Sequence, residues 1–171
     1  MLSDSMKKTL DKSKIPSEET RQTLLNVNNL YTMKLIIAGG RDYQFTSEDL
    51  EFLDGLLNRV SVMVSGACGA KNESQEAKGA DGVGELWANK HNLKIERHYP
   101  DWKAHGRGAG PRRNRAMAES ANAVVLFPGG RGTNSMFAEA KKRNLEIFDL
   151  RLGLSHYKMN QGDQLYLANA R

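Results

Sequence analysis

Residues 123–133, AVVLFPGGRGT, join an apolar run to a glycine-rich turn and then to the start of a helix. The apolar run from Ala123 to Phe127 is typical of a strand that is buried on both faces of a sheet. The turn PGGRGT follows it, and its glycines let the backbone approach a ligand closely. A helix that begins at Thr133 would point free amide groups and a positive dipole end at an anion. The stretch therefore predicts a strand, a phosphate-binding turn and a helix.

The same alternation of short apolar runs and helical stretches continues along the chain. Because the strands are mostly apolar and alternate with helices, we predict an α/β fold, a Rossmann-like parallel sheet of about five strands with helices on both faces. The other predicted elements are strands at 35–38, 60–64, 94–99 and 146–150, and helices at 47–59, at 81–91, from Pro111 onward and at 133–143.

The chain is long enough for one well-filled core. Residues 1–32 are polar and rich in lysine, and we interpret them as an N-terminal extension, within which Ser17 followed by two acids predicts a helix start. Residues 33–150 form the predicted nucleotide-binding domain. Residues 151–171 show no clear period and receive no assignment.

Composition excludes several kinds of protein. Cys68 is the single cysteine, which excludes an internal disulfide and a cysteine-based zinc cage. The four histidines lack metal-ligand spacing, so we predict no metal site and no cofactor. No apolar run approaches the roughly 20 residues of a membrane span, and the first residues lack the apolar stretch of a secretory signal. We therefore expect a cytoplasmic protein without a membrane partner.

Positive charge is concentrated in one part of the chain. The formal net charge is +5, and six basic residues lie between Arg97 and Arg115 against one acid, Asp101. This asymmetry suits an anionic partner. A solvated charged face explains any single member of the group equally well.

Glycine clusters follow several predicted strands. In an open parallel sheet, ligands bind beyond the carboxyl ends of the strands, where the strand order reverses. In the usual order 3-2-1-4-5, the turns GGRD and PGGRGT would face each other. A tight structural connection explains one such turn equally well, but several on one edge favour a ligand. The candidate ligand-binding residues at these ends are Gly39, Gly40, Arg41, Asp42, Ser65, Gly66, Gly129, Gly130, Gly132 and Thr133.

The segment GPRRNRAM, residues 110–117, adds two further candidates. On a helix that begins at Pro111, Arg113 would reach across the crevice to a phosphate or ribose, and Asn114 would hydrogen-bond the ligand. Met117 lies one turn from Arg113 and is expected in the core. The neighbouring Arg112 and Arg115 are expected to face solvent.

Two more candidates allow two interpretations each. Trp102 either stacks on a base or anchors the core. Asp81 either binds the ligand or, as the favoured interpretation, caps the helix that follows it. Glu85 shares a helix face with Asp81 and has the sequence context of a surface acid.

Six motifs occur here in a characteristic order: GGRDY, SG, GAD followed by WA, the DW of PDW, GPRRNRAM and PGGRGT. Together they make residues 33–150 resemble the SLOG superfamily (Smf/DprA and LOG proteins), specifically its YspA/cpYpsA-related branch. The resemblance implies a Rossmann-like fold that binds nucleotides or nucleotide-derived ligands, commonly as a homo-oligomer.

The chain departs from the resembled pattern in two places. The related lonely guy phosphoribohydrolases carry PGGxGTxxE, whose glutamate works with the arginine equivalent to Arg113, but this chain has Met136 at the glutamate position. A thioether can neither accept a proton nor stabilise an oxocarbenium ion, which leaves Arg113 and Glu139 as the catalytic candidates. An insertion also lies between Cys68 and Asp81, and it forms either a lid at the pocket mouth or an inert surface loop.

Three functions compete at this point. The first is binding of a phosphorylated nucleotide-derived small molecule, NAD- or ADP-ribose-like, as a sensor or sequestering protein. The second is N-glycoside hydrolysis with Glu139, Asp81 or Glu85 as the acid, so whether the chain is an enzyme stays open. The third is nucleic-acid binding, ranked last because the aromatic interleaving of a single-strand groove is thin.

Overall fold

The computed structural model describes residues 17–23 and 32–169, with side chains up to residue 162 in the last helix. Contacts divide the chain into two units, Met1–Thr32 and Met33–Arg171. In the first unit, residues 18–23 form a helix, and the Ser17 hydroxyl accepts a hydrogen bond from the Thr20 amide at 3.1 Å. The helix start predicted at Ser17 is therefore present. The predicted extension at 1–16 and 24–31 lies outside the described residues.

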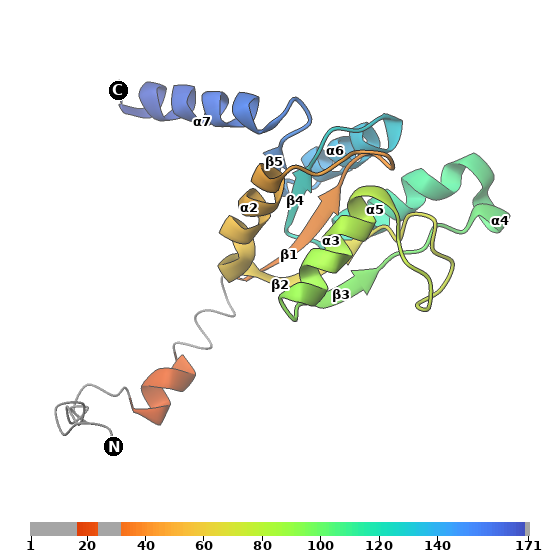
Figure 1. Cartoon of the computed structure of the whole chain (residues 1–171), viewed down its shortest axis with the longest axis horizontal. Helices are drawn as coiled ribbons and strands as arrows, with labels where there is room; N and C mark the ends of the chain where they lie inside the picture. Colours follow the sequence, from red (N-terminus) through yellow and green to blue (C-terminus); the bar gives the residue numbers. More distant parts are fainter. Residues whose placement is uncertain (1–16, 24–31, 170–171) are drawn as a thin grey trace, which may run out of the picture. The chain divides into compact units, whose positions relative to one another are not determined.

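The second unit is built on one parallel sheet (Figure 1). Strand β1 lies at its centre and pairs with β2 on one side and β4 on the other. The order is β3-β2-β1-β4-β5, which confirms the predicted fold class and the strand order used to place the site. The strands are β1 Met33–Ala38, β2 Val60–Ser65, β3 Lys94–Arg97, β4 Ala123–Leu126 and β5 Glu146–Asp149.

Most helices lie where the periodicity predicts them. Helix α5 begins at Ala109, two residues before Pro111. Proline is compatible with this position, because the first four amides of a helix need no intrahelical acceptor. Helix α6 begins at Arg131 rather than at Thr133. The helices are α2 Ser47–Leu56, η3 Leu57–Arg59, α3 Gly79–Lys90, α4 Trp102–His105, η4 Gly106–Gly108, α5 Ala109–Ser120, α6 Arg131–Lys142 and α7 Leu154–Asn169.

Helix α7 has no counterpart in the sequence prediction. Its first turns hold Leu154, which is buried, and Tyr157, whose ring meets Phe52 edge-on at 5.5 Å between centroids. The rest of its described surface is exposed. Since only these few contacts face the domain, the helix lacks the full apolar stripe that marks a helix in sequence.

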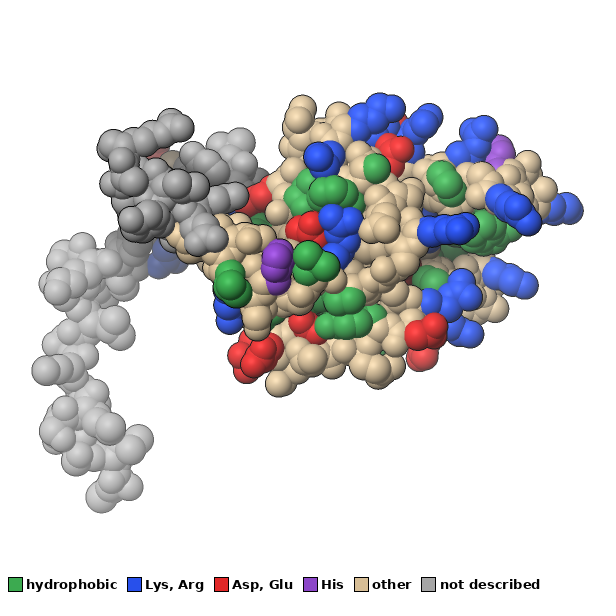
Figure 2. Space-filling model, turned by 90° about the horizontal axis from the view of Figure 1, so that it is seen from above, with side chains coloured by type: hydrophobic (Ala, Val, Ile, Leu, Met, Phe, Trp, Pro, Cys, Tyr) green, Lys and Arg blue, Asp and Glu red, His purple; other side chains and the backbone are tan. Residues whose placement is uncertain are grey.

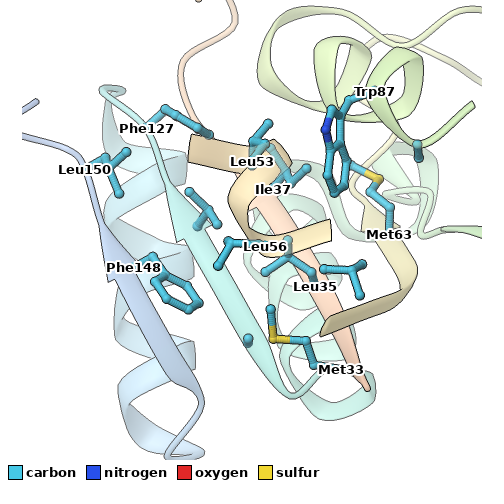
Figure 3. Packing of buried hydrophobic residues seen from close by; sticks show 14 of the residues in the cluster. Met33, Leu35, Ile37, Leu53, Leu56, Met63, Trp87, Phe127, Phe148 and Leu150 are labelled. Carbon is cyan, nitrogen blue, oxygen red and sulfur yellow. The ribbon is translucent and has the colours of Figure 1, made fainter. Parts of the chain in front are cut away.

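Two hydrophobic cores lie on the two faces of the sheet because successive strand residues point to opposite faces. Leu35 and Ile37 point toward α2 and α3, and Trp87 from α3 and Phe148 from β5 belong to the same, larger core (Figure 3). Ile36 points the other way, into a core with Met117 and Met136 from α5 and α6. The prediction that Met117 is a core residue is confirmed.

A polar network joins β1, β3 and α5 at the sheet. Lys34 Nζ donates to Glu96 Oε2 at 2.5 Å, Ser120 Oγ donates to Glu96 Oε1 at 2.7 Å, and His98 Nε2 lies 2.8 Å from the same oxygen. Burial raises the pKa of Glu96, but hydrogen bonds from Lys34, Ser120 and His98 outweigh it and lower that pKa to about 2. The network therefore holds Glu96 ionised.

None of the helices in the described part of the chain has the length and apolarity of a membrane span.

Candidate functional site

The glycine turns after β1 and β4 touch each other at the edge of the sheet. The Gly40 amide donates to the Pro128 carbonyl at 2.8 Å. A methyl group on Gly129 would lie 2.1 Å from Thr133 Oγ1 and 2.7 Å from the Gly40 nitrogen, so only glycine allows this approach. The predicted apposition of GGRD and PGGRGT is present in the structure.

A cleft of about 800 Å³ opens at this edge, above the carboxyl ends of β1 to β4. Its volume lies within the ~300–1,000 Å³ usual for small-molecule sites. Most of the residues predicted to bind a ligand line it: Gly39, Gly40, Arg41, Gly66, Asp81, Trp102, Arg113, Asn114, Gly130, Gly132 and Thr133.

The amino end of α6 contributes hydrogen-bond donors to the cleft. No side chain caps this helix, whose N-cap is Gly130, so its first amides keep free donors. The Thr133 side chain is buried to 5% exposure, and its hydroxyl makes no hydrogen bond within the described part of the chain. Free amides, a helix dipole and an unpartnered hydroxyl together suit an anion.

Arg113 and Asn114 project from α5 into the same cleft. Arg113 Nη1 donates to the Gly66 carbonyl, and its Nε donates to Asn114 Oδ1 at 3.1 Å. Asn114 Nδ2 in turn donates to the Gly132 carbonyl at 3.2 Å and lies 3.3 Å from Ser135 Oγ. These bonds tie α5 to the turn before α6. They also leave further N–H groups of the Arg113 guanidinium for a ligand, since it carries five.

Asp81 lies beside Arg113 on the cleft floor. Its Oδ2 accepts a hydrogen bond from the Cys68 amide at 3.0 Å. Burial raises the pKa of Asp81, opposed by Arg113 and by the amides of Cys68 and Gly66. The favoured prediction that Asp81 caps its helix is wrong: α3 begins earlier, with Lys78 as its N-cap and Gly79 in the left-handed region at φ +60°. Asp81 is instead a first-turn residue facing the cleft.

The lining is strongly cationic. Six basic side chains face the cleft against one acid, Asp81, and none of the six has a carboxylate at ion-pairing distance in the described part of the chain. Figure 2 shows many Lys and Arg side chains and few acids over the right-hand part of that view. Five of the six are exposed. The six are Arg41, Lys71, Lys78, Arg107, Arg113 and Arg131.

The insertion after Cys68 forms one wall of the cleft. Arg97 Nη1 donates to the carbonyls of Asn72 and Gln75, at 3.1 and 3.0 Å. The same guanidinium pairs with Glu85 at 2.5 and 2.9 Å, and Glu85 also accepts from Ser65 Oγ at 2.6 Å. Glu85 is buried, so its interpretation as a surface acid is wrong. The Glu85–Arg97 pair fixes the loop that brings Lys71 and Lys78 to the cleft.

Four predicted residues lie outside the lining. Asp42 is exposed, Ser65 is fully buried against Glu85, and Gly129 packs on Gly40. Glu139 lies two turns into α6, and its carboxylate accepts a hydrogen bond from Arg143 Nη1. None of these four residues lines the cleft.

Sequence reasoning missed part of the lining. Lys71 and Lys78 come from the insertion, Arg131 is the first residue of α6, and Tyr99 lies in the loop after β3. The excess of basic residues was a usable signal for Arg107, which belongs to the basic stretch already noted. Met136 lines the floor at 1% exposure, and Trp102 is 58% exposed, which contradicts a core role for the tryptophan.

The described residues hold no cluster of histidine, cysteine and acidic side chains suited to a metal ion. Arg112 and Arg115 are exposed, as predicted.

Comparisons with known proteins bear chiefly on the fold. No known protein-family model matches the chain. It is 35% identical over 81 residues to the Gene 61 protein of Mycobacterium phage D29, a match covering 43% of this chain and 65% of the phage protein. It also resembles the X-ray structure of DNA processing protein A (DprA) from Streptococcus pneumoniae, with a TM-score of 0.51 and 19% identity over 72% of this chain and 52% of that chain. The chain thus spans about half of DprA and just under two thirds of the phage protein, and the structural likeness shows a shared Rossmann-like fold.

Proposed function

We propose that the chain is a SLOG-type protein that binds a phosphorylated, nucleotide-derived small molecule in the cleft. An NAD- or ADP-ribose-like ligand is the expected class, and the protein acts as a sensor or sequesters the ligand. One observation carries the proposal: six cationic side chains without ion-pair partners in the described chain line one cleft. Unpaired cations gathered in one place repel each other, and a polyanionic ligand relieves that repulsion.

The cleft also supplies the uncharged groups that a nucleotide needs. Glycines at positions 39, 40 and 130 line it, so phosphate oxygens can approach the backbone there without meeting a side chain. The uncapped start of α6 adds amides and a dipole of the right sign. Trp102 is exposed at the rim, where its ring is free to stack on a base.

Binding without turnover is the expected behaviour. Of the acids named earlier as catalytic candidates, Glu139 pairs with Arg143 and Glu85 pairs with Arg97, so both are engaged away from the cleft. Asp81 is the remaining one that lines it. The position that carries a glutamate in the hydrolases holds Met136, which is buried in the second core.

Isothermal titration calorimetry with AMP, ADP-ribose and NAD tests the proposal. We expect at least one to bind and, by mass spectrometry, to be recovered unchanged. Arg131→Met should weaken binding about tenfold, the effect of one charge-assisted contact. Arg112→Met removes an equally exposed charge outside the cleft and should leave affinity unchanged. Absence of binding by all three ligands, or equal effects of the two variants, would refute the proposal; release of free base would favour a hydrolase.

Binding of single-stranded nucleic acid, ranked last from the sequence, gains support from the exposed Trp102 and Arg107, which line the same cleft. Cations that follow a backbone next to aromatic rings are the usual device of such sites. Titrating a fluorescent oligonucleotide at increasing salt separates the candidates. A steep loss of affinity with salt indicates several phosphate contacts, whereas a mononucleotide site gives a shallow dependence.

A further inference from the structure

The order of the strands sets the order of the loops along the cleft. Because β3, β2, β1 and β4 are successive neighbours, the loops that follow them are successive as well. Tyr99 and the first residue of α4, Trp102, follow β3, Gly66 follows β2, and Gly130 with the first turn of α6 follows β4. An aromatic end and an anion-binding end therefore lie on opposite sides of Gly66. A nucleotide has the same sequence of parts, in which the sugar separates the base from the phosphate.

The side chains of Arg113 and Asp81 both lie close to Gly66. A methyl group at this glycine would lie 2.5 Å from Arg113 Nη1 and 3.0 Å from Asp81 Oδ2. The two side chains thus share the centre of the floor, yet they form no direct ion pair. A ligand group seated over Gly66 would meet a cation on one side and a carboxylate on the other.

The carboxylate is out of place in a site built only for phosphate. Asp81 is one acid among six cations, and it would repel a phosphate group placed against it. An ionised carboxylate offers about four acceptor positions, and the amides of Cys68 and Gly66 occupy two of them. It therefore has capacity for a neutral donor from the ligand. Because burial already raises the pKa of this group, an added donor would stabilise the charge.

We infer that Asp81 accepts hydrogen bonds from the ribose hydroxyls of the ligand, so that the cleft selects ribonucleotides over deoxyribonucleotides. The inference rests on the proposed function and specifies its ligand class. Arg113 then serves the phosphate side of the sugar, and Trp102 serves the base. Asp81 acts as a specificity-determining residue, because a deoxy sugar lacks the hydroxyl donor that this carboxylate would accept from a ribose.

Paired ribo- and deoxyribonucleotides test this assignment. The probes are AMP, GMP, ADP and their 2′-deoxy counterparts, with 3′-deoxy-AMP, measured by calorimetry on the full chain. We expect the wild-type protein to bind at least one deoxy form about tenfold or more weakly than its ribo form, the ratio for one lost hydrogen bond to a charged group. Asp81→Asn should reduce that ratio to near one. Glu51→Gln, which removes an exposed charge from α2, should keep it.

The outcomes separate the two proposals. Equal binding of ribo and deoxy forms by the wild-type protein overturns the role of Asp81 and leaves nucleotide binding intact. An equal loss of both forms in Asp81→Asn indicates a structural residue and overturns it as well. Absence of binding by every probe overturns the role of Asp81, and it overturns nucleotide binding as well if ADP-ribose and NAD also fail to bind. The wild-type comparison needs no variant to fold, so it decides the matter even if Asp81→Asn is unstable.

Discussion

Replacing Arg97 with methionine tests how the cleft wall is held in place. The guanidinium contacts Glu85 twice, with Nε to Oε1 at 2.9 Å and Nη2 to Oε2 at 2.5 Å. The Glu85 side chain is 8% exposed and that of Arg97 is 17% exposed. Methionine keeps an apolar stem but removes the charge and every donor. The Glu85 carboxylate then stays buried with the Ser65 hydroxyl as its remaining donor among the described contacts.

The expected loss follows from that geometry. Removing one partner of a buried ion pair costs about 3–5 kcal/mol, because the other charge is left uncompensated. The carbonyls of Asn72 and Gln75 also lose a donor, but both residues are exposed and water replaces it, so they add less than about 1 kcal/mol. We therefore expect the free energy of unfolding to fall by about 4 kcal/mol. For a domain of this size, the melting temperature should fall by about 10 °C.

Urea denaturation monitored by circular dichroism measures this loss. Glu85→Gln should cost only about 2 kcal/mol, because Arg97 is nearer to solvent and keeps its two loop carbonyls. The double variant should be about 2 kcal/mol more stable than the sum of the two losses predicts, which is the coupling energy of the pair. Arg112→Met, on an exposed face, should change stability by less than about 0.5 kcal/mol. A loss below about 1 kcal/mol for Arg97→Met, or strict additivity in the double variant, would refute the reasoning.

Three further predictions concern pH and packing. Glu96→Gln should lower the free energy of unfolding by about 2 kcal/mol at pH 7, as measured by urea titration. The pKa of Glu96 falls from 4.5 in the unfolded chain to about 2 in the folded protein. The difference between the variant and the wild type should therefore be complete above about pH 4.5 and vanish toward pH 2. Asp81→Asn should stabilise the ligand-free protein by about 1 kcal/mol at pH 7 in thermal melts, because burial raises the pKa of Asp81 and the fold favours its neutral form. The gain should disappear below pH 3.8, where the Asp81 carboxylate is protonated in the unfolded chain as well. Gly129→Ala should cost about 2 kcal/mol in the same assay because its methyl group would overlap Thr133 and the Gly40 amide, whereas Gly130→Ala, which meets open space, should be neutral; equal effects at the two glycines would contradict the packing described.

The sheet was predictable because its signal is local. Each strand is a short apolar run, and the runs at Leu35, Val60 and Ala123 lie where the periodicity puts them. Helix α7 was not predictable, since its few core contacts, such as Tyr157 on Phe52, join residues far apart in the sequence. A tertiary contact of this kind leaves no period in the chain.

The candidate site likewise contains residues that local sequence predicts and residues that only distant contacts bring to the cleft. The glycine turns and Arg113 were predictable from local spacing and strand order. Lys71 and Lys78 were not, because the loop that presents them is held by Arg97, more than twenty residues away in sequence. Asp81 was assigned to the wrong role for a local reason: Gly79 takes a left-handed φ of +60° and lets α3 begin before it.

The cleft has a floor and a rim of different construction. Backbone and buried side chains form the floor around Gly40, Gly66 and Thr133, and Arg113 lies there too, whereas the five other cations form the rim and are exposed. Exchanging a rim residue thus costs little stability, and changes at separate rim positions should combine independently. Single substitutions at the rim can therefore change which anion the cleft binds, one side chain at a time, while the floor and the cores stay unchanged.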